Sequence, residues 1–162
     1  MLEKYDRTRH NKEEVKNLLT MAIGYPTQES LGKLLDVVYD IEGHHLFVTQ
    51  TKSFLTRKIT ITGIIGIDIT TPPHGWILHI AVHPDYRRRG LGKSLISQVM
   101  EKFKLESVAL ETDDDAVDFY RACGFNVVEI RSKWAGVRRY RCSKGQLPKS
   151  VLEYYNNLSL PQ

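Results

Sequence analysis

A glycine-containing turn between an expected strand and an expected helix most constrains the fold of this chain. Residues 87–94 read Arg-Arg-Arg-Gly-Leu-Gly-Lys-Ser, an apolar run at residues 76–82 precedes them, and an amphipathic stretch begins at Leu91. Glycine permits a tight turn and close approach of the backbone to a ligand, and the first amides of a helix point outward. With a short strand expected at residues 107–110, the pattern predicts a βαβ unit whose turn binds an anion such as a phosphate.

Two better-known phosphate-binding turns do not fit these residues. The P-loop of nucleotide-hydrolysing enzymes needs a glycine five residues before Gly92, and Arg87 stands there. The dinucleotide fingerprint would start at Gly90 and needs glycine or alanine at the position of Leu95. The pattern that remains is Arg-x-x-Gly-x-Gly between a strand and a helix.

The first half of the chain shows helical periodicity followed by strand periodicity. Asn11 followed by a glutamate three residues later is typical of a helix start, and a second amphipathic helix begins at Leu31. Isoleucines at the odd positions of residues 59–70 alternate mostly with polar residues, Asp68 among them. This alternation predicts a long strand that pairs antiparallel with residues 76–82.

The last third of the chain predicts a short helix and a final pair of strands. Three aspartates at residues 113–115 offer N-caps for the helix, which ends at Gly124, where a left-handed residue is expected. Strands are expected at residues 126–131 and 137–142. Residues 145–162 form a polar tail with a small apolar patch and no motif, so residues 1–162 are expected to be one domain with a C-terminal tail.

Composition excludes several classes of protein. The formal charge is +4, from 23 basic and 19 acidic residues, which is modest for a nucleic-acid-binding protein. No apolar run approaches the roughly 20 residues of a membrane span. The two cysteines, Cys123 and Cys142, lie far apart, which fits a reducing cytoplasm. Adjacent histidines of a strand point to opposite faces, so no metal site is expected.

Two segments resemble the GNAT family of acyl-CoA N-acyltransferases. The pyrophosphate-binding loop of that family reads Gln/Arg-x-x-Gly-x-Gly/Ala, as residues 87–92 do, and residues 78–86 are similar to the strand and turn before it. Residues 116–125 resemble the family's A-x-x-F-Y-x-x-x-G-F segment. The resemblance implies an α/β fold of the α+β type, with a mixed, mostly antiparallel sheet that is flanked by helices and splayed at the βαβ unit.

The resemblance also implies acetyl-CoA as the cosubstrate and direct transfer of its acetyl group to a primary amine of a small molecule or a protein. In similar enzymes the pantetheine arm pairs with the strand before the loop, and the loop amides bind the pyrophosphate. The cofactor-binding residues implied are Ile80, Ala81, Val82, Arg87, Arg88, Arg89, Gly90, Leu91, Gly92, Lys93, Ser94, Asp113 and Phe119. By family analogy, Tyr120 donates a proton to the departing thiolate.

The base that deprotonates the amine stays open. Many relatives carry a carboxylate on the central strand where this chain has Ile77. Glu111, Asp68 and His79 are the candidates among the side chains, and a water relay or an amine that is already neutral would serve as well. We expect Glu111 to be catalytic alongside Tyr120.

The absent strand carboxylate also keeps a second class of function open. A non-catalytic acyl-CoA-binding sensor or regulatory module on the same fold would keep the cofactor cleft and lack turnover. The expected partners are an amine acceptor and no nucleic acid or membrane. The sequence is compatible with a monomer or a homodimer.

Overall fold

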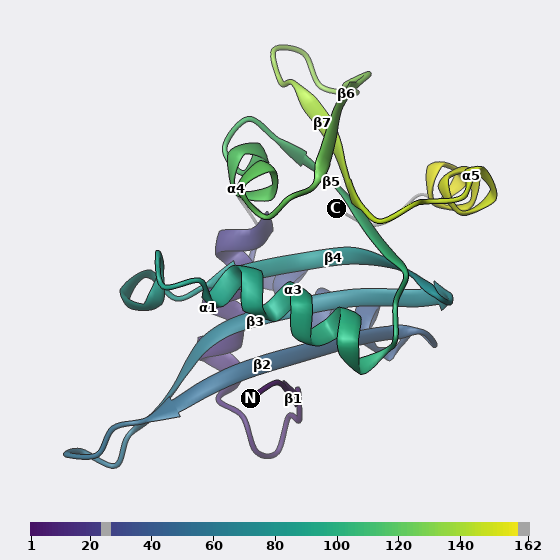
Figure 1. Cartoon of the computed structure of the whole chain (residues 1–162). Helices are drawn as coiled ribbons and strands as arrows, with labels where there is room; N and C mark the ends of the chain where they lie inside the picture. The colour runs from purple at the N-terminus through teal and green to yellow at the C-terminus, as the bar shows by residue number, and fades with distance from the viewer. Residues whose placement is uncertain (24–26, 159–162) are drawn as a thin grey trace.

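The computed structural model of the chain, which describes residues 1–23 and 27–158, contains one seven-stranded sheet with strand order β1-β2-β3-β4-β5-β7-β6 (Figure 1). The strands are β1 Glu3–Lys4, β2 His44–Lys52, β3 Ile59–Thr71, β4 His74–Val82, β5 Ser107–Asp113, β6 Asn126–Ile130 and β7 Arg139–Lys144. The helices are α1 Lys12–Ile23, α2 Gln28–Asp36, α3 Leu91–Lys102, α4 Val117–Ala122 and α5 Lys149–Asn157, with short 3-10 turns η1 Val38–Asp40 and η2 Pro84–Tyr86.

The βαβ unit expected from the sequence is present. Strand β4 pairs parallel with β5, α3 connects them, and every other neighbouring pair in the sheet is antiparallel. Figure 1 shows α3 lying across the sheet and β5 diverging from β4 toward β7 and β6. The fold class predicted from the sequence, a mixed and mostly antiparallel sheet flanked by helices, is therefore confirmed. None of the described helices has the length and apolar character needed to span a bilayer.

Strand β3 has two buried faces. Ile65 and Ile67 pack in the core beneath α3 and α4, whereas Ile61 and Ile64 pack against α1 and α2. The expected strand is confirmed, but its odd-numbered isoleucines do not share one face. The reason is a bulge at Thr62, where the register with β2 skips one residue and moves Ile61 to the opposite side.

Local capping rules predict some helix ends and miss others. Asn11 caps α1 as expected, because its Oδ1 accepts hydrogen bonds from the amides of Glu13 (3.0 Å) and Glu14 (3.2 Å). Gly124 has the expected left-handed conformation, with φ of 84°. The expectation that residues 113–115 cap α4 is wrong: the N-cap is Ala116, without a side-chain hydrogen bond.

The tail expected after residue 144 includes a helix that belongs to the fold. Val151 and Tyr155 of α5 are buried in a small core with Trp76 of β4 and Ala109 of β5. The ring of Tyr155 stacks on that of Trp76 with a centroid separation of 4.5 Å. Helix α5 thus covers the sheet where β4 and β5 are paired.

Candidate active site

Strands β4 and β5 pair over a short stretch and then separate. The pairs are His74 with Ser107, Gly75 with Val108, and Trp76 with Ala109. Beyond them β4 continues to Val82 and β5 to Asp113, with no further pairing between the two strands. The part of β4 beyond Trp76 therefore has a free edge, whose backbone groups are available to a ligand.

The hydrogen-bond alternation of an antiparallel pair identifies the free groups. The amide of His83 donates to the carbonyl of Thr62 in β3 (2.8 Å), so His83, Ala81 and His79 direct their backbone groups toward β3. Ile80 and Val82 direct theirs toward the free edge. Of the three strand residues expected to bind a cofactor, Ile80 offers both backbone groups and Val82 its amide, since the Val82 carbonyl accepts a hydrogen bond from Arg87. The backbone groups of Ala81 face β3.

The turn after β4 presents unpaired amides at the start of α3. Gly90 is the N-cap, with φ of 77° and no side-chain cap, and Arg88 is also left-handed, with φ of 59°. The amide of Ser94 donates to the carbonyl of Gly90 (2.9 Å) as the first helical hydrogen bond. The amides of Leu91 to Lys93 therefore lack helical acceptors, which is the arrangement that binds anions.

The cationic side chains of this turn have different roles. Arg87 folds back, because its Nε donates to the carbonyl of Val82 (3.0 Å) and its Nη2 lies 3.4 Å from the sulfur of Met21. Arg89 lies over the ring of Tyr86 at 5.6 Å. Arg87 thus braces the turn, and the exposed side chains of Arg88, Arg89 and Lys93 supply positive charge around it.

Gly92 lies against Phe119 of α4. A Cβ atom at Gly92 would lie 2.8 Å from the Phe119 ring, so a side chain at this position would displace that ring. The residue is therefore glycine because α3 and α4 approach closely here, in addition to the turn requirement recognised in the sequence. Asp113 lies at the end of β5, and its Oδ1 accepts a hydrogen bond from the amide of Asp115 (3.1 Å), which stabilises the turn before α4.

Tyr120 occupies a buried position on α4. Its side chain is 4% exposed, and its ring meets those of Phe119 and Phe125 edge to face. Burial raises the pKa of the Tyr120 phenol well above its usual value. The phenol consequently stays protonated at neutral pH and is a hydrogen-bond donor.

Glu111 and Asp68, two of the candidate bases, both contact basic side chains. The Glu111 carboxylate accepts a hydrogen bond from Arg141 Nη2 (2.8 Å), which also donates to Asn156 Oδ1 of α5 (2.7 Å). Asp68 is 1% exposed, with Oδ2 3.2 Å from His44 Nε2. Burial would raise the pKa of Asp68, but the adjacent His44 side chain and hydrogen bonds from Thr70 outweigh it and lower that pKa.

His79, the third candidate, is hydrogen-bonded to Tyr39 of η1. The Tyr39 hydroxyl lies 2.6 Å from His79 Nδ1. Burial, with a smaller contribution from His44, lowers the pKa of His79 to about 4, so the ring is neutral at physiological pH. The sequence identifies His79 as a candidate but does not identify Tyr39, Arg141 and Asn156. Tyr39 and Arg141 contact candidate bases, and Asn156 contacts Arg141, only in the folded chain, and no local pattern indicates those contacts.

The cysteines and histidines do not form a second reactive centre in the described ranges. Cys123 and Cys142 are buried free thiols, and burial raises the pKa of both, that of Cys142 to about 11. A thiol with a raised pKa is a poor nucleophile. No group of three or more potential metal-binding side chains occurs within residues 1–23 and 27–158.

Sequence comparison relates the chain to N-acetyltransferases. Residues 16–125 match the acetyltransferase (GNAT) family. Glucosamine 6-phosphate N-acetyltransferase of Schizosaccharomyces pombe is 36% identical over 100 residues, which is 60% of this chain and 82% of that protein. The ribosomal protein bS18-alanine N-acetyltransferase of Escherichia coli is 34% identical over 94 residues, which is 52% of this chain and 64% of that protein.

Structural comparison leads to the same fold. Aminoglycoside 6'-N-acetyltransferase complexed with coenzyme A has a TM-score of 0.68 at 13% identity, with 92% of this chain and 98% of that chain covered. The ribosomal-protein-S18-alanine N-acetyltransferase from Escherichia coli has a TM-score of 0.65 at 16% identity, with 92% and 96% covered. The match over residues 16–125 contains the splayed strands, the anion-binding turn and Tyr120. The chain belongs to the GNAT acetyltransferase family.

Proposed function

We propose that this protein transfers the acetyl group of acetyl-CoA to a primary amine. The observation that carries the proposal is that one part of the fold combines three features. These are the free edge of β4, the unpaired amides at the start of α3, and Tyr120 on α4. A pantetheine arm carries amides that pair with a strand edge, and a pyrophosphate is an anion that a helix start binds. Relatives and structural neighbours of the chain that act on amines or bind CoA support this reading.

The residues present fit this cosubstrate. Ile80 offers its amide and carbonyl to the pantetheine arm and Val82 offers its amide, because the Val82 carbonyl is bound by Arg87. The amides of residues 91–93 offer donors to the pyrophosphate. Around Gly90 the space is open, because a Cβ atom there would meet no other residue within 4 Å. Exposed Arg88 and Lys93 add charge that favours a phosphorylated ligand.

Tyr120 supports the departure of the sulfur. As the amine nitrogen bonds to the acetyl carbon, the carbon–sulfur bond breaks and negative charge develops on sulfur. A protonated phenol stabilises that charge by donating a hydrogen bond, and the thiol is complete once the sulfur receives a proton. This role is supported by the protonated state of Tyr120 and by its place as the tyrosine of the A-x-x-F-Y-x-x-x-G-F segment at residues 116–125.

The acceptor is proposed as a class, a primary amine of a small molecule or of a protein. The relatives named above modify an amino sugar phosphate and an alanine of a ribosomal protein. Glu111, Arg141 and Asn156 form a polar network on the α5 side of the sheet, where the acceptor would approach the splay. We place the protein in the cytoplasm because its two buried cysteines are free thiols. We propose that it acts as a monomer or a homodimer.

A calorimetric titration with acetyl-CoA and CoA, with ATP and NAD as controls, tests the cosubstrate. We expect micromolar affinity for acetyl-CoA that is lost in Gly90→Val. The matched control is Gly136→Val, because Gly136 also has a positive φ (73°) and open space but lies in the β6–β7 connection. Absence of CoA binding by the folded wild type would refute the proposal.

A thiol-release assay with a panel of primary amines separates an enzyme from a non-catalytic acyl-CoA-binding module. Release of CoA in proportion to acetylated amine supports the enzyme. Tight acetyl-CoA binding without turnover on sugar, polyamine and peptide amines would favour the sensor module instead.

A further inference from the structure

A bulge in β4 turns His79 toward the α1–α2 side of the sheet. The register with β3 skips Leu78, because Gly66 pairs with His79 and Ile67 pairs with Ile77. Leu78 packs with the α1–α2 core, and His79 faces the same way because its cross-strand partner Gly66 faces Tyr39. His79 thus comes one residue before the free backbone groups of Ile80.

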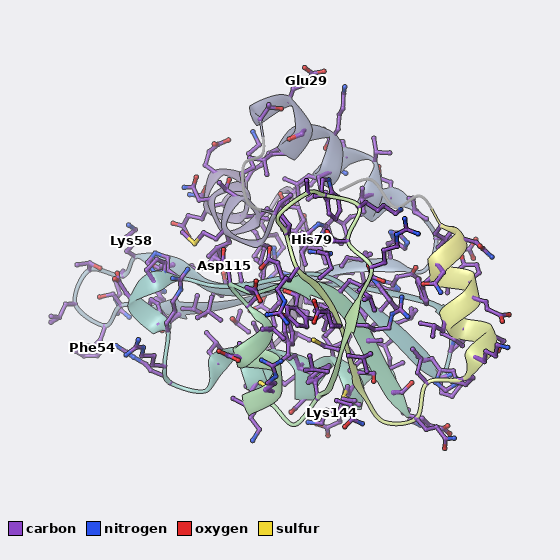
Figure 2. The ribbon with its side chains drawn as sticks, turned by 90° about the horizontal axis from the view of Figure 1, so that it is seen from above. Glu29, Phe54, Lys58, His79, Asp115 and Lys144 are labelled. Carbon is purple, nitrogen blue, oxygen red and sulfur yellow. The ribbon has the colours of Figure 1, made fainter. Side chains whose placement is uncertain are left out.

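Gly66 makes room for the partner of His79. A Cβ atom at Gly66 would overlap the Tyr39 hydroxyl, so only glycine lets Tyr39 lie over β3 and reach His79. The Tyr39 hydroxyl contacts Nδ1 at 2.6 Å. The other ring nitrogen, Nε2, has no hydrogen bond with the described residues and is not among the fully buried polar atoms. Figure 2 labels His79 near the middle of the molecule.

We propose that Nε2 of His79 accepts the proton of the acceptor amine and that Tyr39 is the positioning residue that holds the ring. This inference rests on the acetyl transfer proposed above. This assignment requires the tautomer in which Nδ1–H donates to the Tyr39 oxygen, since only then does Nε2 carry a lone pair. It places the base on β4, beside the free strand edge, although the chain has Ile77 in place of a strand carboxylate.

The step balances without a further reactant. The amine nitrogen forms a bond to the acetyl carbon, and the carbon–sulfur bond breaks with its electron pair on sulfur. One amine proton moves to Nε2, which gives an imidazolium with both nitrogens protonated. That proton returns to solvent, and the sulfur gains a proton through Tyr120, so the products are the amide and the free thiol of CoA.

The surroundings of His79 favour it over Glu111 for this role. Tyr39 of η1 contacts the ring, His44 of β2 adds a repulsive charge when protonated, and Gly66 of β3 contributes no side chain. Burial, with a smaller contribution from His44, lowers the pKa of His79 and keeps the ring neutral. The Glu111 carboxylate, by contrast, already forms an ion pair with Arg141.

Steady-state kinetics with glucosamine 6-phosphate and with an alanine-initiated peptide test the assignment. We expect His79→Gln to lower kcat by about 10²- to 10⁴-fold with unchanged acetyl-CoA affinity. Tyr39→Phe should lower kcat by about 10- to 100-fold. The control is His74→Gln on the same strand, where Nδ1 lies 2.8 Å from Ser107 Oγ and turnover should stay within about 2-fold of wild type.

Glu111→Gln separates the two candidate bases. We expect it to raise the acceptor KM while kcat falls by less than about 10-fold, because the ion pair with Arg141 is lost but the base remains. A large loss of kcat in Glu111→Gln together with wild-type kcat in His79→Gln would overturn the assignment and leave the acetyl transfer intact.

Nitrogen NMR of the histidine rings gives a readout that needs no acceptor. At pH 7 we expect the His79 ring in the neutral form with the proton on Nδ1, and loss of this tautomer preference in Tyr39→Phe. A proton on Nε2 in the wild type would overturn the proposal. If the wild type binds acetyl-CoA but acetylates neither amine, these two acceptors are wrong, and a proton on Nε2 would still overturn the role proposed for His79.

Discussion

Tyr155 of α5 stacks on Trp76 of β4, with ring centroids 4.5 Å apart and planes inclined by 18°. Trp76 is the last β4 residue that pairs with β5, so this contact fixes the sheet directly before the splay. The next residue of α5, Asn156, accepts a hydrogen bond from Arg141, the partner of Glu111. The C-terminal helix therefore supports both the splay and the polar network beside it.

Removing the Tyr155 ring should destabilise the fold. We expect Tyr155→Ala to lower the free energy of unfolding by about 3–5 kcal/mol, because a buried aromatic ring and its stacking are lost. Tyr155→Phe keeps the stack, and its hydroxyl is buried without a well-aligned partner, so the loss should be below about 1 kcal/mol. Urea unfolding of both variants measures the difference. Equal losses would show that the hydroxyl, not the ring, anchors α5.

Gly92 and Phe119 should be energetically coupled. Gly92→Ala places a Cβ 2.8 Å from the Phe119 ring and should destabilise the protein by about 1–2 kcal/mol. Phe119→Ala removes the ring that is displaced, so the double variant should lose less than the sum of the two single changes. A double-mutant cycle by urea unfolding measures this coupling, and strict additivity would contradict the contact.

Local patterns in the sequence predict the elements of this fold better than the contacts between them. The Asn11 cap, the left-handed Gly124 and the βαβ unit depend on neighbouring residues, so periodicity and turn chemistry were sufficient. The bulge at Thr62 depends on pairing with β2, which no local alternation reveals.

The candidate site shows the same limit. Its anion-binding turn is one contiguous segment and is readable from the chain. The contact between Tyr39 and His79 joins residues that are 40 positions apart and requires a glycine at position 66 on a third element. Likewise, the residues of α5 read as a polar tail in the sequence because the partner of Tyr155, Trp76, lies far away in sequence.

The low pKa of His79 predicts a specific loss of stability in acid. The ring has a pKa of about 4 in the folded protein and an ordinary value of 6.5, so the unfolded chain binds more protons between these two values. The stabilisation is present above pH 6.5 and is lost as the pH falls toward 4. When the pH falls from 7 to 5, we expect protonation of His79 in the unfolded chain to lower the free energy of unfolding by about 2 kcal/mol.

Urea unfolding of the wild type and of His79→Gln at pH 7 and pH 5 isolates this contribution from other groups. The variant should lose about 2 kcal/mol less than the wild type on acidification. Identical losses in the two proteins would mean that His79 keeps an ordinary pKa.

Tyr120→Phe tests the hydrogen-bond donor to sulfur. We expect kcat to fall by about 10²- to 10⁴-fold while acetyl-CoA affinity is retained, because the phenol stabilises charge that develops only as the carbon–sulfur bond breaks. The control is Tyr140→Phe, which also removes a phenol hydroxyl. The Tyr140 hydroxyl donates a hydrogen bond to Asp114 Oδ1 at 2.5 Å. This variant should keep kcat within about 5-fold of the wild-type value. Single-turnover acetyl transfer and calorimetry with acetyl-CoA measure the two quantities. Unchanged turnover in Tyr120→Phe would assign the residue to the core between α4 and the sheet, where its ring meets Phe119 and Phe125.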